Sequence, residues 1–244
     1  STLLLEAKDL LVETSGSLLA QDALTAEAIN QFRHLGSASS VADVVTLAAG
    51  GSMEIAGTVS SLAKKLLTLR SDEDLILKAD LSNEGGNILL KAESGTISQD
   101  AGKKVIADEL ELRVKKGTSL TTRVDSLVAS VSSAGDLSIT ELDALELENV
   151  EIFLGDVTVV AGGELTATDV SIQAAGSGNL LSLQTTAGAL LNVGKVSAGS
   201  LGKVSLTSDA GMVMLNMGAA VVEAGELSVT AKAAVSLLTD VESL

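Results

Sequence analysis

A short phrase recurs along this chain, in which a glycine and a polar residue precede alternating aliphatic and hydroxyl residues. Two copies are GKVSLTS (202–208) and GELSVTA (225–231). The first residues of five such phrases are Gly135, Gly155, Asn179, Gly202 and Gly225. Their spacings of 20, 24, 23 and 23 residues are typical of the coils of a solenoid. A single coil encloses no core, so such a chain is expected to fold by stacking each coil on the next.

Three strands are predicted in each coil, because aliphatic and polar residues alternate as half-buried strands require. The first strand is expected to turn inward Leu137, Ile139, Val157, Val159, Leu181, Leu183, Val204, Leu206, Leu227 and Val229. The second strand is expected to turn inward Leu145, Leu147, Leu165, Ala167, Leu191, Val193, Val213, Leu215, Val235 and Leu237. A weaker third strand carries Val150, Ile152, Val170, Ile172, Val196, Val221 and Val241. The sequence therefore predicts an all-β solenoid with about 20–24 residues and three short strands per coil.

The composition fits long hydrogen-bonded ladders. Proline is absent, so no backbone N–H is lost anywhere along the chain. Aromatic residues make up 1% of the chain, so the core is expected to consist of Leu, Val, Ile and Ala. Side chains of this kind favour repetitive stacking over irregular packing around large rings.

One solenoid domain is expected to span residues 1–244, less regular in 1–134 and most regular in 135–244. Two segments break the alternation, and enlarged loops are predicted near 26–51 and 113–136. The second segment leaves an alternative open, a short helix. Helical spacing is shared there by Leu120, Val124, Leu127 and Val131.

The charge of the chain excludes some partners. With 32 acidic and 16 basic residues the net charge is −16, which repels nucleic acids and anionic membranes. No apolar run is long enough for a membrane-spanning helix. The absence of cysteine rules out disulfides and thiolate metal sites.

No catalytic, cofactor-binding or metal-binding residue is predicted. The one histidine, His34, is interpreted as a surface or loop residue. The acidic groups Asp72, Glu73 and Asp74, and Glu109 with Glu111, are interpreted as solvated side chains on an outer face. Calcium-binding nonapeptide and EF-hand spacings are absent, so we expect no cofactor beyond adventitious calcium.

Two long runs resemble a known family. Residues 83–150 and the stretch GDVTVVAGGELTATDVSI (155–172) are similar to the repeat region of large filamentous-haemagglutinin-like exoproteins of Gram-negative bacteria. The resemblance implies a right-handed parallel β-helix, export across the outer membrane and a place outside the cell or on its outer surface. The secretion domain that such proteins carry at their amino terminus is missing from this sequence, which implies a fragment or a processed form.

Taken together, these observations predict a structural or adhesive rod segment of a secreted or surface-exposed bacterial exoprotein, without catalysis. Carbohydrate-active β-helices use catalytic acid groups and aromatic platforms for sugar rings, and this chain has almost no aromatic residues. One alternative is a self-assembling fibre subunit whose two ends, both still in repeat pattern, continue into further coils or identical chains. Another is a module that binds a host or matrix glycan or protein through the irregular segments 26–51 and 113–136.

Overall fold

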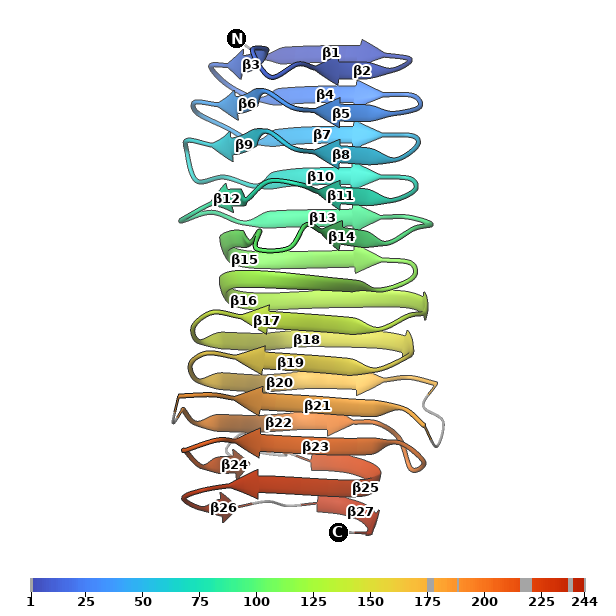
Figure 1. The fold of residues 1–244 in the computed structure, drawn as a ribbon, viewed down its shortest axis with the longest axis vertical. Coiled ribbons are helices and arrows are strands. Elements are labelled where there is room, and N and C mark those ends of the chain that lie inside the picture. The colour runs from blue at the N-terminus through green and yellow to red at the C-terminus, as the bar shows by residue number, and fades with distance from the viewer. Residues whose placement is uncertain (1, 175–177, 188, 216–220, 237–238, 244) are drawn as a thin grey trace. The chain divides into compact units, whose positions relative to one another are not determined.

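The structure is a computed structural model that describes residues 2–174, 178–187, 189–215, 221–236 and 239–243. Every regular element in these ranges is a β-strand. The chain divides into two compact units, Ser1–Arg123 and Val124–Leu244. Each unit is a stack of coils with parallel strands, so the predicted all-β solenoid is confirmed (Figure 1).

Three rows of parallel strands build the first unit. The first row consists of β1 (Leu3–Ala7), β4 (Leu24–Ala28), β7 (Val45–Ala49), β10 (Leu67–Ser71), β13 (Ile88–Ala92) and the second half of β15 (Val105–Val114). The second row consists of β2 (Leu10–Val12), β5 (Phe32–His34), β8 (Met53–Ile55), β11 (Leu75–Leu77) and β14 (Ile97–Gln99), which pairs with the start of β16 (Thr118–Ala134). The third row contains β3 (Ser17–Ala20), β6 (Ser37–Ser40) and β9 (Thr58–Ser61), and then β12 (Leu81–Asn83), which pairs with the first half of β15.

The second unit repeats the same plan. Its first row contains β17 (Leu137–Glu141), β19 (Val157–Ala161), β21 (Leu180–Thr185), β23 (Lys203–Ser208) and the end of β25 (Val221–Ala231). Its second and third rows share the long strands β18 (Leu145–Leu154), β20 (Leu165–Ile172) and β22 (Leu191–Ser197). These rows also take in β24 (Val213–Leu215), the start of β25, β26 (Val235–Ser236) and β27 (Thr239–Ser243).

The core of the second unit is largely the predicted one. Nine of the ten aliphatic residues predicted to point inward on the first strand are buried, and Val229 is half-buried. Two predictions on the other strands are wrong. Val222, not Val221, pairs with Val196 and points inward. Val235, on β26, is 51% exposed and does not point into the core. Leu237, and the side chains of Leu215 and Val241, lie outside the described residues.

The first unit is more regular than expected. The residues that align along its first row are Leu3, Leu24, Val45, Leu67, Ile88 and Leu110. Their spacings are 21, 21, 22, 21 and 22 residues, which are more even than those of the second unit. Residues 26–51 do not form the expected enlarged loop, because they contain most of β4 and all of β5, β6 and β7. The inward residues there include small or polar ones such as Ala26, Ala38 and Ser40, which hid the alternation.

Residues 113–136 also differ from both alternatives, since most of the segment is the strand β16. The inward residues are Leu120, Thr122 and Val124 in one run, and then Leu127, Ala129 and Val131. The two runs have a period of two, but the two intervening residues Asp125 and Ser126 shift the second run by one position. Two such runs out of phase imitate helical spacing, which explains the ambiguity in the sequence.

The burial pattern predicts very different effects on stability for the same substitution at two adjacent residues. Leu206 is fully covered and Ser205 faces outward. Leu206→Asp would place a carboxylate in an aliphatic stack, so we expect it to prevent folding of the second unit, at a cost of several kcal/mol. Ser205→Asp is expected to shift the melting temperature by only a few degrees. Circular dichroism melting of the two variants is the measurement, and equal effects would contradict the assigned register.

Candidate functional site

His34 lies inside the first unit, so its interpretation as a surface or loop residue is wrong. It is an inward residue of β5, is fully covered, and stands in register between Val12 of β2 and Ile55 of β8. Its Nε2 atom lies 3.0 Å from the carbonyl oxygen of Thr58. Burial lowers the pKa of His34 below its ordinary value, and the Thr58 hydrogen bond opposes this only in part.

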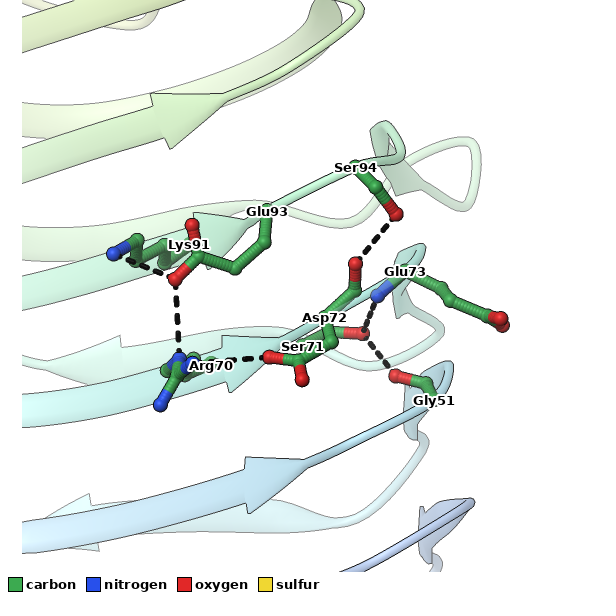
Figure 2. A network of polar contacts seen from close by, with 8 residues as sticks. All are labelled: Gly51, Arg70, Ser71, Asp72, Glu73, Lys91, Glu93 and Ser94. Carbon is green, nitrogen blue, oxygen red and sulfur yellow. Dashed lines mark hydrogen bonds and ion pairs between the residues drawn. The ribbon is translucent and has the colours of Figure 1, made fainter.

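The acidic run Asp72–Asp74 lies at a corner where β10 turns toward β11. Figure 2 shows Asp72 and Glu73 of this run. Arg70 reaches Asp72 at 3.1 Å and Glu93 of the next coil at 3.2 Å. Lys91 also contacts Glu93, at 2.7 Å, and Ser94 donates to the Asp72 carbonyl at 2.6 Å. Glu73 and Asp74 are exposed, as predicted, and Asp72 is half-buried. The ion pair of Arg70 with Glu93 joins neighbouring coils, so this corner does not only face solvent.

A buried hydroxyl supports the same corner from inside. The Ser71 Oγ atom lies 2.6 Å from the carbonyl oxygen of Gly51 in the previous coil and 2.9 Å from that of Asp74. It also accepts a hydrogen bond from the Glu73 N–H, at 3.2 Å. The corner therefore keeps its backbone groups paired although it belongs to no ladder.

Aspartates bind the turns of adjacent coils in both units. In each case a carboxylate oxygen accepts a hydrogen bond from a backbone N–H about one coil away. The pairs are Asp74 with Thr96, Asp80 with Lys104, Asp108 with Gly85, Asp136 with Asp156, and Asp156 with Leu180, at 2.7–3.1 Å. Much of the acidity of the chain therefore serves its fold.

The other predicted carboxylates, Glu109 and Glu111, both face outward on β15, as expected. Asn87 of the previous coil donates to Glu109 at 2.8 Å, and Arg113 forms an ion pair with Glu111. Both carboxylates are therefore held by a polar or charged neighbour.

Outward carboxylates of the first unit are also paired with cations of neighbouring strands. Glu54 contacts Lys78 at 2.9 Å and Arg33 at 2.8 Å, and its side chain is 18% exposed. The hydrogen bond from Lys78 is the main reason that the pKa of Glu54 is lowered, with Arg33 adding to it. Lys91, and to a lesser extent Arg70, lower the pKa of Glu93 in the same way.

The second unit contains a surface without such cations, which we name the acidic face. Residues 124–194 include ten Asp or Glu and no Lys or Arg. The acidic face is the outward side of β18, which runs through the second and third rows: Glu146 and Glu148 in the second, then Glu151 and Phe153 in the third, all exposed. Two of its carboxylates have neutral neighbours on β20 or just after it. Thr168 donates to Glu146 and Gln173 donates to Glu151, each at 3.4 Å.

A hollow of about 240 Å³ lies beside this face. Asp125, Glu146, Glu164 and Thr166 line it together with Ala144 and Leu145. Asn192 of β22 donates a hydrogen bond to Glu164 at 2.7 Å, which fixes the position of this carboxylate in the wall of the hollow. Phe153, at the other end of β18, is 47% exposed and is the one aromatic ring on this face. These carboxylates can contact a cationic group by charge, and Phe153 can do so through its ring face.

Within the described residues, no three His, Asp or Glu side chains are grouped so that they could hold a metal ion. A search of the same ranges for a helix long and apolar enough to cross a membrane finds none. Comparison of the chain with family models, curated proteins and solved structures gives no match.

The aspartate contacts predict a measurable contribution to stability. Asp74→Ala removes the acceptor for the Thr96 N–H and hydroxyl, and we expect it to lower the free energy of unfolding of the first unit by about 1–2 kcal/mol. Asp74→Asn keeps one carbonyl oxygen and should lose less than half of this. Urea unfolding of the two variants measures these free energies. An alanine variant as stable as the wild type would show that water replaces the contact.

Proposed function

We propose that this chain is a structural and adhesive segment of a secreted or surface-exposed bacterial exoprotein, and that it is not an enzyme. The observation that carries the structural part is the use of side chains in both units. Inward positions stack aliphatic residues in register, and many outward and corner groups bond to the adjacent coil. Such coils give a persistent scaffold built from nearest-neighbour contacts.

The place outside a Gram-negative cell belongs to the same proposal. It is supported by the resemblance of residues 83–150 and 155–172 to filamentous-haemagglutinin-like exoproteins, now joined by the solenoid fold that this resemblance implies. The absence of Cys and the acidic surface are compatible with it.

The adhesive part is proposed for the acidic face rather than for the segments 26–51 and 113–136, which form regular strands. Glu146, Glu148 and Glu151 project from one strand without a described cation beside them, whereas Glu54 and Glu93 each contact two. A partner rich in Lys or Arg would supply the missing charges. We therefore propose a basic protein segment of the host or matrix as the bound group.

Bead adhesion tests the proposal. Beads that carry the full chain are expected to adhere to immobilised basic matrix protein, less so as salt is raised. Glu146→Gln, Glu148→Gln and Glu151→Gln combined should reduce the adhering fraction about tenfold, and Phe153→Ser about threefold, because these residues make the contact.

The matched control changes three exposed carboxylates of the first unit, Glu6→Gln, Glu13→Gln and Glu27→Gln, to give the same net charge. It should adhere like the wild type. An equal loss of adhesion in both triple variants would mean that adhesion depends on the net charge of the chain and not on the acidic face. No adhesion by the wild type would overturn the adhesive part of the proposal.

A further inference from the structure

The imidazole of His34 is incompletely bonded in the interior of the first unit. Because Nε2 faces the Thr58 carbonyl oxygen, it carries the ring hydrogen and donates it. The other nitrogen, Nδ1, is buried and has no hydrogen-bond partner among the residues that the structure describes. A proton added at Nδ1 would therefore create a charged N–H with no acceptor, in an interior that favours the neutral ring.

No carboxylate faces this ring from the strands around it. β2, β6 and β9 contain no charged residue. Glu54 of β8 and Arg33 of β5 point outward and pair with each other. Glu13, in the turn after β2, is exposed. The nearest described ring is Phe32, whose centroid lies 6.4 Å from that of His34.

The contact of His34 with Thr58 joins two coils. His34 belongs to the second coil, and Thr58 begins β9 of the third. The carbonyl oxygen of His34 also accepts the N–H groups of Ala56 and Gly57 in the third coil. The backbones of the two coils approach closely at this corner, since a Cβ at Gly57 would lie 2.0 Å from the Gly36 carbonyl oxygen. To bring Nδ1 into water, the ring must leave Thr58 and the corner must open.

We propose that His34 is an acid-sensitive latch, which joins the second coil to the third at neutral pH and opens the corner between β5 and β6 when it is protonated. An exterior scaffold with such a latch would loosen locally in an acidic surrounding while the rest of its coils stay folded. This device does not depend on the proposed adhesive function.

The pH range follows from the direction of the shift. The folded pKa of His34 is lowered, whereas in the opened corner it returns to about 6.5. The closed form is therefore fully favoured above about pH 6.5 and loses stability as pH falls toward the folded pKa. One proton is taken up on opening, so the open population rises up to tenfold per pH unit in this range. Glu54 and Glu93, whose pKa values are lowered from 4.5, titrate below it.

Hydrogen exchange of the full chain at pH 7.5, 6.5 and 5.5, corrected for the intrinsic exchange rate at each pH, measures the opening. Peptides from residues 24–61 are expected to gain exchange severalfold to tenfold between pH 6.5 and 5.5, and peptides from 157–172 to stay constant. His34→Leu, which matches Ile55 and Leu77 in the same column, should remove this gain.

A pH-independent wild type, or a leucine variant with the same pH response, would overturn the latch. Because His34 is the one histidine of the chain, its ring signal in an NMR titration is unambiguous. A ring pKa at or above 6.5 in the native chain would also overturn the proposal, even if the leucine variant failed to fold.

Discussion

The parallel hydrogen-bonded ladder between successive coils is the constraint on which the rest of the structure depends. It fixes strands above equivalent strands, so residues 17–26 positions apart become direct neighbours. Corners must then stack as closely as strands do. A Cβ at Gly36 would lie 2.2 Å from the Gly16 carbonyl oxygen, and one at Gly162 would lie 2.3 Å from that of Leu142. Glycine stands at these corners because the backbone of the adjacent coil occupies the space of a side chain.

Polar residues inside the coils follow from the same constraint. The turns between strands leave backbone groups without a ladder partner, and buried hydroxyl and amide groups satisfy them. Ser61 donates to the Asp43 carbonyl oxygen, and Asn83 donates to that of Lys65. Glu141 accepts three backbone N–H groups, from Val124, Leu142 and Asp143. His34 is different, because one of its two ring nitrogens has no such partner among the described residues.

The sequence predicted the fold class and the inward residues best where large aliphatic residues held the inner positions, as Leu181 and Leu183 do. It failed where alanine, serine or histidine held them, since burial there comes from coil stacking and not from the hydrophobicity of the segment. The burial of His34 and the contacts of Asp74 were beyond prediction because both depend on residues one coil away. The run without Lys or Arg was visible in the sequence, but which of its carboxylates lie exposed on β18 depends on the strand register.

The two units distribute charge differently over the same kind of framework. Residues 1–123 contain 13 Lys or Arg and 17 Asp or Glu, whereas residues 124–244 contain 3 and 15. The aliphatic ladders are similar in both, so this difference does not arise from the needs of the core. The carboxylates of β18 have neutral residues beside them on the adjacent strands, such as Ser126 and Thr166 next to Glu146, whereas Glu54 and Glu93 of the first unit each contact two cations. Carboxylates without a described cation beside them are the place where a positively charged partner would gain most by binding.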